Sequence, residues 1–317
     1  MVLPLVVISL IAGCVLLTSG AKLLCGSAVH IVRKFSTNSI AIEILLVSMG
    51  TAAPDLVSAT VAVFEGHPDV SIGNILGSNF TNLTLGFGLA SLVAPFKCTK
   101  KNAKLEFPLL LALTVIFILF CIDGKLSRLE GSALLFFFAL YIFHTLTKKN
   151  ECNSDNLPPE NSATHSGTWK LRKSIFTFII SSVLLGYGAH LLVKSCCQIA
   201  DFYELSKTFI GFSLLSFGTS APEIFVVVAA AKQHRNTICS GNIIGSNLIN
   251  LMCVSGLCAT ICPFSFQKNI FLPEAFSLLL ATLATWYIFS TKKTFSRICG
   301  AVFLAMYLLV MLLIKGH

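Results

Sequence analysis

The chain has 317 residues, of which 55% are apolar and only 12% are charged. Soluble domains carry about 25% charged residues, so the composition excludes an ordinary soluble protein and predicts an integral membrane protein surrounded by a lipid bilayer. A net charge of +9 could indicate a nucleic acid partner, but the positions of the Lys and Arg residues indicate none. No protein partner can be inferred.

Apolar runs of about twenty residues, each long enough to cross a bilayer as a helix, recur along nearly the whole chain. The first run lacks a charged leader region and a small-residue cleavage site, which predicts a retained helix rather than a signal peptide. The sequence therefore predicts an all-α protein whose membrane spans lie at residues 2–24, 38–64, 71–95, 105–123, 130–148, 173–198, 207–231, 238–263, 270–290 and 296–315.

The second span contains GTAAPD at residues 50–55, which places Asp55 near its middle. A charge at the bilayer centre costs about 2.5–3.5 kcal/mol, so such a residue faces a partner or a water-filled cavity and is a functional candidate. Pro54 has no backbone N–H, and we expect it to break the helix and free a carbonyl near Gly50.

The third span begins with GNILGSNFTN at residues 73–82. Asn74, Ser78 and Asn82 recur every four residues and therefore form one stripe on a helix. A polar stripe in a membrane helix faces other helices or an ion pathway, and helix–helix packing alone is the alternative interpretation.

A polar segment rich in Asn, Ser and Pro lies between the two halves of the chain, at residues 149–172. We predict a largely disordered cytoplasmic linker, too short for a folded regulatory domain.

The second half of the chain repeats the first at a constant offset of 168 residues. GTSAPE at residues 218–223 places Glu223 where the first half has Asp55, and GNIIGSNLIN at residues 241–250 repeats the polar stripe. Pro222 is expected to break its helix as Pro54 does.

The offset divides the chain into a first five-helix repeat at residues 1–148, with its motif region at 48–82, and a second at residues 173–317, with its motif region at 216–250. Because five is an odd number, the second repeat enters the membrane from the opposite side. The predicted fold is therefore ten transmembrane helices as two inverted five-helix repeats, an arrangement typical of secondary transporters.

The loops after the first, third, fifth, seventh and ninth spans hold sixteen Lys and Arg residues, and the loops on the opposite side hold six. Cytoplasmic loops carry the positive excess. We therefore predict a multi-pass protein of the plasma (cytoplasmic) membrane with both termini outside and the linker in the cytoplasm.

Asp55 and Glu223 are the deepest of the fourteen acidic residues, and apart from Glu43 the others are predicted to lie in loops or at helix ends. The twelve Cys residues form no paired CxxC motifs, so neither a disulfide framework nor a zinc site is predicted. The 26 Phe residues are interpreted as mostly lipid-facing, and none indicates a cofactor.

The motif residues supply hard oxygen ligands. The hydroxyls of Thr51, Thr219 and Ser220 accompany the two carboxylates and the carbonyls freed by the prolines. Such clusters suit Na⁺, Ca²⁺ and Mg²⁺, with about six to eight ligands typical of Ca²⁺, whereas Cu and Zn prefer softer donors.

The paired motifs, GTAAPD with GNILGSN and GTSAPE with GNIIGSN, resemble the α-repeats of the cation/calcium antiporter superfamily, which includes the sodium/calcium exchangers. The resemblance covers nearly the whole chain and is to the prokaryotic type, because there is no large regulatory loop. It implies a transporter, not an enzyme, that exchanges cytosolic Ca²⁺ for external Na⁺ by alternating access. The ion sites would lie at mid-membrane between the second, third, seventh and eighth helices.

Carried over position by position, the resemblance implies Asp55 and Glu223 as the central acids. The other implied metal ligands are the hydroxyls of Thr51, Thr219, Ser220, Ser78 and Ser246, the amides of Asn82 and Asn250, and the backbone carbonyls of Ser48 and Ser216.

Three positions depart from the family pattern. The first acid is usually Glu but is Asp55 here, Ala52 replaces the usual serine, and Asn250 stands where some prokaryotic and potassium-dependent members have Asp. Two carboxylates balance one Ca²⁺, whereas several Na⁺ ions bound together would leave net positive charge, so the usual Na⁺:Ca²⁺ ratio does not follow from these residues. Asn250 argues mildly against potassium dependence.

Other functions stay open from the residues alone. The exchanged pair could be Ca²⁺ and H⁺, or could include Mg²⁺ or Mn²⁺, because motif spacing does not discriminate among hard cations. An intramembrane enzyme is less favoured, since the sequence has no HExxH or GxSxG motif. A channel is disfavoured because inverted repeats favour coupled exchange.

Overall fold

The structure is a computed structural model that describes residues 2–35, 49–97, 102–147, 171–291 and 294–314. Ser48 and Glu43 lie outside the described residues, as does the predicted linker except for its last two positions, which already belong to a helix.

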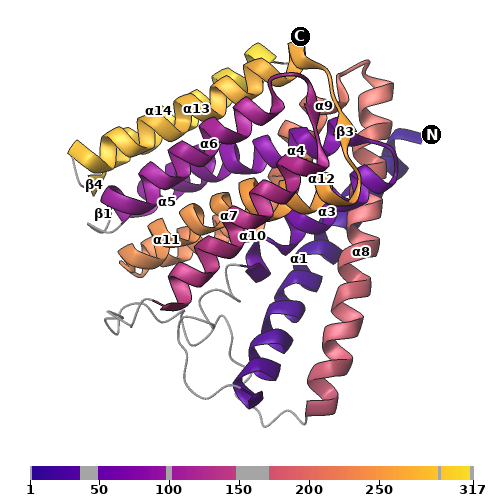
Figure 1. Cartoon of the computed structure of the whole chain (residues 1–317), viewed down its shortest axis with the longest axis horizontal. Helices are drawn as coiled ribbons and strands as arrows, with labels where there is room; N and C mark the ends of the chain where they lie inside the picture. The colour runs from indigo at the N-terminus through magenta and orange to yellow at the C-terminus, as the bar shows by residue number, and fades with distance from the viewer. Residues whose placement is uncertain (1, 36–48, 98–101, 148–170, 292–293, 315–317) are drawn as a thin grey trace.

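The described chain is almost entirely helical (Figure 1). Its α-helices are α1 (Val2–Phe35), α3 (Ala53–Phe64), α4 (Pro68–Thr81), α5 (Phe87–Val93), α6 (Phe107–Cys121), α7 (Arg128–Thr147), α8 (Leu171–Phe202), α9 (Lys207–Ile210), α10 (Ser216–Lys232), α11 (Asn236–Ile249), α12 (Ser255–Ile261), α13 (Lys268–Thr291) and α14 (Arg297–Ile314).

Short π-helical segments and two-residue strands complete the described structure. The π-helical segments are η1 (Asn82–Gly86), η2 (Asn102–Glu106), η5 (Gly211–Leu215) and η6 (Asn250–Val254). The strands are β1 (Phe96–Lys97), β2 (Lys125–Leu126), β3 (Phe264–Ser265) and β4 (Thr294–Phe295), and they pair antiparallel as β1 with β4 and β2 with β3.

Seven helical segments of the described chain are long and apolar enough to cross a membrane. They lie at Leu3–Ser27, Ala103–Cys121, Lys173–Phe202, Lys207–Lys232, Ile238–Ile261, Lys268–Thr291 and Arg297–Ile314. Of the remaining predicted spans, 71–95 overlaps α4 to α5 and 130–148 overlaps α7, whereas 38–64 is described only from residue 49 and contains the shorter apolar helix α3. The chain is therefore an all-helical, multi-pass membrane protein.

The offset of 168 residues that relates the sequence motifs also relates structural elements. Moving α4, η1 and α5 along the chain by 168 positions gives the bounds of α11, η6 and α12, and the same shift carries β1 onto β3. Each strand pairs with a strand of the other half. The two copies are thus built alike and packed against each other.

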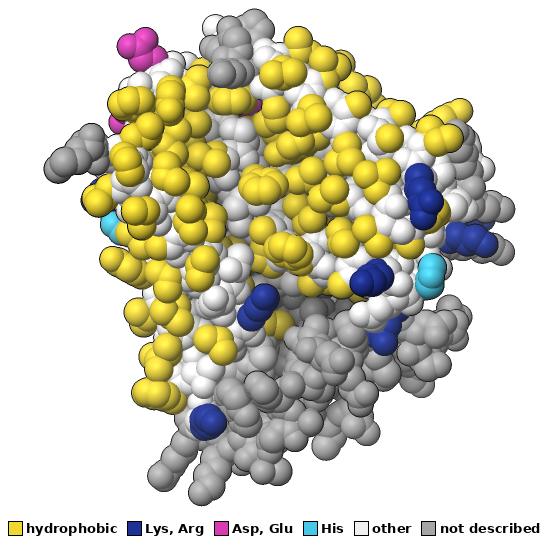
Figure 2. Space-filling model, turned by 180° about the vertical axis from the view of Figure 1, so that it is seen from behind, with side chains coloured by type: hydrophobic (Ala, Val, Ile, Leu, Met, Phe, Trp, Pro, Cys, Tyr) yellow, Lys and Arg dark blue, Asp and Glu magenta, His cyan; other side chains and the backbone are white. Residues whose placement is uncertain are grey.

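The surface agrees with a membrane environment. Hydrophobic side chains cover most of the face in Figure 2, Lys and Arg gather along its lower and right-hand edges, and acidic side chains lie at its upper left. Leu129, Phe225 and Ile298 each expose more than 70% of their surface. Soluble monomers rarely expose apolar surface over so wide an area.

Many phenylalanines lie in the core rather than facing lipid. Phe87, Phe96, Phe107, Phe289 and Phe295 are fully buried and contact one another at centroid distances from 5.1 to 6.5 Å. This cluster lies at the end of the bundle where β1 pairs with β4. The interpretation of Phe as mostly lipid-facing is therefore wrong for these residues, because composition does not distinguish a packed aromatic from one in lipid.

Two long helices, α1 and α8, run side by side (Figure 1), and α8 also packs against α3. They approach closely at small residues: a Cβ atom on Gly188 would lie 2.8 Å from the backbone N of Leu17. Both helices are longer than predicted, since α1 continues past residue 24 to Phe35 and α8 begins at Leu171. Hydropathy marks the buried length of a helix and not its polar extension.

The start of the motif helix α4 packs directly on the backbone of α9 and η5. A Cβ atom on Gly73 would lie 2.1 Å from the carbonyl oxygen of Thr208, and one on Gly211 would lie 2.3 Å from that of Val70. Neither position can hold a larger residue, so this contact fixes how the two motif regions meet.

Candidate cation-binding site

The two motif acids lie on packed helices and are both removed from solvent. Asp55 is on α3 with 1% of its surface exposed, and Glu223 is on α10 with 0% exposed. The two carboxyl groups are close enough to interact electrostatically. In a low-dielectric interior such a pair needs compensating positive charge or hydrogen-bond donors.

The proline beside each acid acts differently in the two copies. The chain bends at Ala52, and α3 begins with Pro54 in its first turn, where a missing N–H costs nothing. In contrast, α10 runs without interruption through Pro222. The predicted helix break is therefore found before Asp55 but not before Glu223, where surrounding helices hold the segment helical.

Both oxygens of the Asp55 carboxylate accept hydrogen bonds. The hydroxyl of Ser78 donates to Oδ1 at 2.8 Å, and the side-chain amide of Asn250 donates to Oδ2 at 2.7 Å. One donor comes from α4 in the first repeat, and the other from the start of η6 in the second. The site is thus assembled from both copies of the motif.

Glu223 differs, because neither of its carboxyl oxygens has a hydrogen-bond partner among the described residues. The hydroxyls of Ser220 and Ser246 are also buried without a partner, as are the amide oxygens of Asn82 and Asn250. Buried polar atoms are normally satisfied. Buried, unsatisfied oxygens on the motif residues are the donor set that a hard cation takes.

The repeat makes this asymmetry informative. Under the offset of 168, Ser246 and Asn82 correspond to Ser78 and Asn250, so they are the two residues expected to donate to Glu223. Ser246 has no partner, and the amide of Asn82 donates instead to Asn247 at 3.0 Å. The Asp55 side of the site is closed by its own hydrogen bonds, and the Glu223 side is open to a ligand.

Thr219 links the two halves of the site. Its hydroxyl lies 3.3 Å from that of Ser78 and 3.2 Å from the amide oxygen of Asn74. The carbonyl of Ser216, an implied ligand, accepts from the same hydroxyl at 3.2 Å. The hydroxyl proton of Thr219 can serve only one acceptor at a time, so this group can turn toward a cation without losing all its contacts.

A second set of hydrogen bonds, between buried Asn side chains, was not predicted from the sequence. Asn247 accepts from Asn82 and donates to the carbonyl of Asn79 at 3.1 Å, while Asn79 donates to the carbonyl of Ile75 at 2.7 Å. Asn79 and Asn247 are the same residue of the two repeats. They fall off the stripe of every fourth residue, so the helical spacing gave no reason to select them. The sequence signal that could have identified them is that each is the Asn of a GSN triplet.

Two π-helical segments begin at the Asn residues that close the motifs. η1 starts at Asn82 and η6 starts at Asn250, while a third, η5, ends immediately before Ser216. The i→i+5 pattern leaves backbone carbonyls out of the regular α-helical ladder, and such segments are frequent at functional sites. Periodicity in the sequence did not predict them.

The structure buries most of the predicted ligands, and hydrogen bonds connect Asp55, Ser78, Thr219 and Asn250. Buried side chains of the implied set are Asp55, Glu223, Thr219, Ser220, Ser78, Ser246, Asn82, Asn250 and Ser216. Thr51 is half-buried in the turn before α3, and Ser48 lies outside the described residues. In the described part of the chain, no three His, Cys, Asp or Glu side chains form a metal-binding group. Any ion held here relies on hydroxyl, amide and carbonyl oxygens as well as the two acids.

One acid was misplaced by the sequence analysis. Glu274 on α13 was expected at a helix end, yet it is fully buried, and both of its carboxyl oxygens lack partners among the described residues. The sequence signal that could have identified Glu274 is its position just inside the start of an apolar run. The prediction was wrong because it assumed that acids near helix ends reach the membrane interface.

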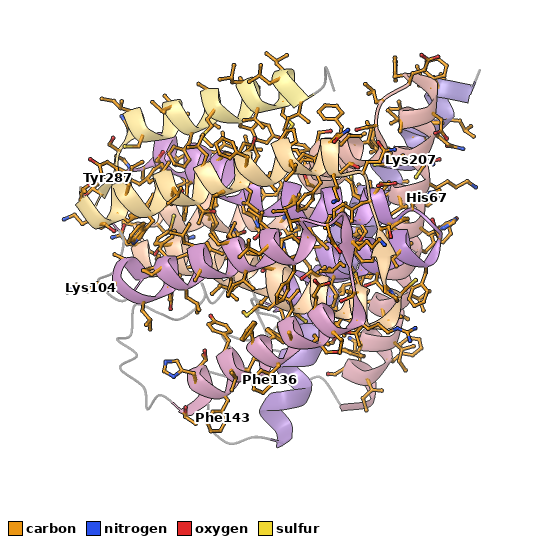
Figure 3. The ribbon with its side chains drawn as sticks, turned by 45° about the horizontal axis from the view of Figure 1, so that its top comes forward. His67, Lys104, Phe136, Phe143, Lys207 and Tyr287 are labelled. Atoms are coloured by element: carbon orange, nitrogen blue, oxygen red, sulfur yellow. The ribbon has the colours of Figure 1, made fainter. Side chains whose placement is uncertain are left out.

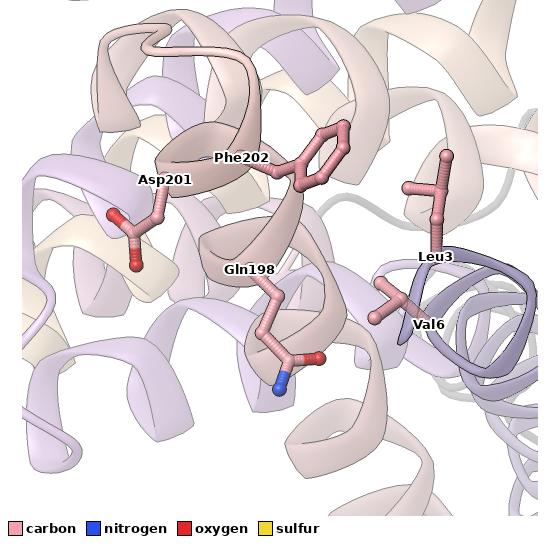
Figure 4. Close-up of a pocket in the computed structure, with 5 residues that line it drawn as sticks. All are labelled: Leu3, Val6, Gln198, Asp201 and Phe202. Atoms are coloured by element: carbon pink, nitrogen blue, oxygen red, sulfur yellow. The ribbon is translucent and has the colours of Figure 1, made fainter. Parts of the chain in front are cut away.

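A surface pocket of about 330 Å³ lies elsewhere, between the start of α1 and the end of α8 (Figure 4). Its lining residues are Leu3, Val6, Gln198, Asp201 and Phe202. It contains a single carboxylate and none of the motif residues, so it is not the site predicted from the sequence.

Known proteins resemble this chain in both sequence and structure. The family described as "Sodium/calcium exchanger protein" matches residues 5–147 and again residues 173–315. Inner membrane protein YrbG of Escherichia coli is 30% identical over 277 residues, covering 86% of this chain and 85% of that protein. Sodium/calcium exchanger MaX1 of Methanosarcina acetivorans is 27% identical over 337 residues, covering 94% and 95%.

A solved structure of the sodium-calcium exchanger NCX_Mj, soaked with Na⁺ and Sr²⁺, is similar to this fold with a TM-score of 0.65 and 27% sequence identity. The similarity covers 98% of each chain. The likeness thus extends over the whole bundle.

Proposed function

The chain belongs to the sodium/calcium exchanger family, and from this premise we propose that it exchanges Ca²⁺ for Na⁺ by alternating access, with the ions bound between Asp55 and Glu223. It is a multi-pass membrane transporter, a cation antiporter and not an enzyme. The proposal concerns which cations it exchanges and which residues hold them.

The observation that carries the proposal is the pair of buried acids with unequal partners. Asp55 is satisfied by two donors, whereas neither carboxyl oxygen of Glu223 has a partner among the described residues, and other oxygens of the same motifs are also buried without partners. An isolated anion at this depth costs several kcal/mol, and a cation binding next to Glu223 removes that cost. The names of MaX1 and NCX_Mj, both sodium/calcium exchangers, support Ca²⁺ and Na⁺ as the ions.

Competition for one site couples the two ions. Asp55 and Glu223 carry two negative charges, which one Ca²⁺ or two Na⁺ ions balance. Bound Ca²⁺ and bound Na⁺ therefore exclude each other, and the loaded site can cross the membrane as a nearly neutral unit. The empty site keeps both charges uncompensated, which opposes its movement across the bilayer and enforces exchange over leak.

The proposed topology is ten membrane spans as two inverted five-helix repeats in the plasma membrane, divided at residues 149–172. Both termini are outside and the linker is cytoplasmic. Support comes from the bias of Lys and Arg to one set of loops and from the shift of 168 residues that relates α4–η1–α5 to α11–η6–α12. In this orientation α4, α9 and α13 begin at the outer side.

The departures from the family pattern fit a site for one divalent cation. Asn250 donates to Asp55 through its amide nitrogen, a bond that an ionised Asp could not make. Ala52 is buried and brings no hydroxyl. The site thus holds two carboxylates rather than three and one hydroxyl fewer, which favours a low number of Na⁺ ions for each Ca²⁺.

Proteoliposomes test the identity of the ions. We expect ⁴⁵Ca²⁺ uptake when the vesicles contain Na⁺ and the bath does not, and no uptake driven by K⁺ or pH gradients. Uptake driven only by a pH gradient would replace Na⁺ by H⁺ in the proposal. Uptake of Mg²⁺ or Mn²⁺ that excess Ca²⁺ does not inhibit would indicate another divalent substrate. Flux that persists without any counter-ion gradient would indicate a channel.

A further inference from the structure

Glu274 presents the same unsatisfied chemistry as Glu223 at a different place in the fold. In the described part of the chain the buried acids are Asp55, Glu223 and Glu274, and Glu274 has 0% of its surface exposed. It lies one and a half turns inside α13, between the buried residues Phe271 and Ala275. Neither of its oxygens accepts a hydrogen bond from the described residues.

A second carboxylate lies near it, on the other side of the interface between α13 and α4. Asp69, in the first turn of α4, interacts electrostatically with Glu274. The backbone N–H of Gln267, just before α13, donates to the Asp69 carboxylate, but its Oδ1 atom is buried without a partner. Three buried carboxyl oxygens on two neighbouring acids are therefore left without donors.

The nearby basic groups compensate only one of the two acids. Lys207, at the start of α9, and His67, just before α4, interact with Asp69. Figure 3 places both labelled residues at the same end of the bundle, opposite Lys104. Glu274 lies deeper in the bundle, and its electrostatic partner is another anion.

We propose that Asp69 and Glu274 form a second divalent-cation site, of the class that binds Ca²⁺, where α4, α9 and α13 begin. The charge of Glu274 is left uncompensated, and the oxygens of the two carboxylates are the ligands that Ca²⁺ takes. A proton alone fits less well, because a protonated Glu274 would keep its O–H without an acceptor among the described residues.

The second site is distinct from the first. Asp69 precedes Ser78 by nine residues on the same helix, which is about 13 Å along the axis. Glu274 interacts with Asp69, whereas Glu223 interacts with Asp55. A cation held here would be concentrated at one mouth of the bundle, at the end where α4 leads toward the motif residues.

The repeat provides a matched control. Glu106, at the end of η2, corresponds to Glu274 under the offset of 168, but it is only half-buried and lies at the opposite end of the bundle. Replacement of either acid by Gln removes one charge without changing shape, so a difference between the two variants reports the local site rather than the loss of charge.

Equilibrium binding of ⁴⁵Ca²⁺ to the purified full chain in detergent tests the proposal, in a background that carries both Asp55→Asn and Glu223→Gln. We expect one Ca²⁺ to remain bound in this background, to be lost on adding Glu274→Gln, and to stay on adding Glu106→Gln. Asp69→Asn should weaken the remaining binding by about tenfold or more. Monodisperse elution and an unchanged melting temperature establish that each variant is folded.

No bound Ca²⁺ in the background, or binding that survives Glu274→Gln, would overturn the second site. If the variant with Asp55→Asn and Glu223→Gln is unfolded, the number of bound Ca²⁺ ions is measured on the otherwise wild-type chain instead. There Glu274→Gln should remove one Ca²⁺ and leave one. An unchanged count there would equally refute the site and show that Glu274 holds only a proton. The first arm removes the central acids, so its result is independent of the proposed function; in the second arm, loss of one Ca²⁺ on Glu274→Gln tests the second site, whatever number remains.

Discussion

At the scale of single residues, the site is asymmetric although its two halves come from one motif. Ser78 donates to Asp55, while its counterpart Ser246 is buried without a partner. A hydrogen bond to a charged group contributes about 1.5–3 kcal/mol, and an unsatisfied buried group costs about 1–3 kcal/mol. Equivalent substitutions at the two serines should therefore have opposite consequences in the cation-free protein.

We expect Ser78→Ala to lower the stability of the cation-free protein by about 1–3 kcal/mol, because Asp55 loses a donor. Ser246→Ala should leave stability unchanged or raise it slightly. Thermal unfolding in detergent without Na⁺ or Ca²⁺ measures both. Equal destabilisation by the two changes would contradict the assigned asymmetry.

The amide at position 250 allows a second prediction. Asn250→Asp would replace a donor by a third carboxylate next to Asp55. Like charges about 4 Å apart repel by about 1–4 kcal/mol near a protein surface or in water, so the cation-free variant should melt at a lower temperature than the wild type. Its stabilisation by saturating Ca²⁺ should in turn be larger. A variant that melts like the wild type without ions would show that Asn250 does not face Asp55.

Only some of these residues could be identified from the sequence. The duplicated GTxAP acids and the GSN serines were predictable because the cost of burying a polar group limits its possible roles. Asn79 and Asn247 were not selected, because their contact depends on how α4 and α11 cross. Glu274 was taken for an interfacial acid, since hydropathy alone does not show that α13 packs its first turns against α4.

At the scale of elements, the contact between α4 and the α9–η5 segment depends on glycine. A Cβ atom on Gly73 would lie 2.1 Å from the carbonyl oxygen of Thr208, whereas one on its repeat counterpart Gly241 would meet none of the described residues within 4 Å. The segment of the first repeat that corresponds to α9 and η5, residues 39–47, lies outside the described residues, so the close contact is described for Gly73 and not for Gly241.

We expect Gly73→Ala to destabilise the protein by about 1–3 kcal/mol, the usual range for overpacking, and to reduce transport by displacing Asn74 and Ser78. Gly186→Ala on α8 is the control and should change stability little, because a Cβ atom there would meet none of the described residues within 4 Å. Melting temperatures and initial uptake rates of the two variants in the same vesicles measure the difference. Equal effects would mean that the close α4 contact does not position the site.

The π-helical segments were beyond sequence-based prediction for a related reason. η1 and η6 start at equivalent Asn residues, so they belong to the repeated design of the site. Apolar periodicity locates helices but does not distinguish i→i+4 from i→i+5 hydrogen bonding. Only the packed structure shows where the backbone hydrogen bonds change from the i→i+4 to the i→i+5 pattern.

At the scale of the whole molecule, the repeat accounts for both the fold and the site. A fixed offset relates α4, η1, α5 and β1 to α11, η6, α12 and β3, and the second half supplies a donor to the acid of the first, since Asn250 donates to Asp55. The all-helical, multi-pass character of the chain could be predicted from apolar run length. The packed Phe cluster and the lengths of α1 and α8 could not, because they depend on contacts between distant segments.

The proposed topology makes a direct prediction. An epitope after His317 should be accessible to antibody on intact cells, and one inserted in the linker at residues 149–172 should become accessible only after permeabilisation. The charge bias between the two sets of loops is the reason. Surface labelling by fluorescence measures both, and an epitope at the C-terminus that is detected only in permeabilised cells would reverse the orientation.

The most direct test of the central claim is Na⁺-gradient-driven ⁴⁵Ca²⁺ uptake into proteoliposomes that contain the wild type, Glu223→Gln or Glu65→Gln. Glu65 is an acid at the end of α3 that pairs with His190 outside the site, so its variant controls for loss of a carboxylate. The wild type and Glu65→Gln should take up Ca²⁺, and Glu223→Gln should take up none above empty vesicles. Normal uptake by Glu223→Gln would contradict the assignment of the buried acid pair as the ion-binding site.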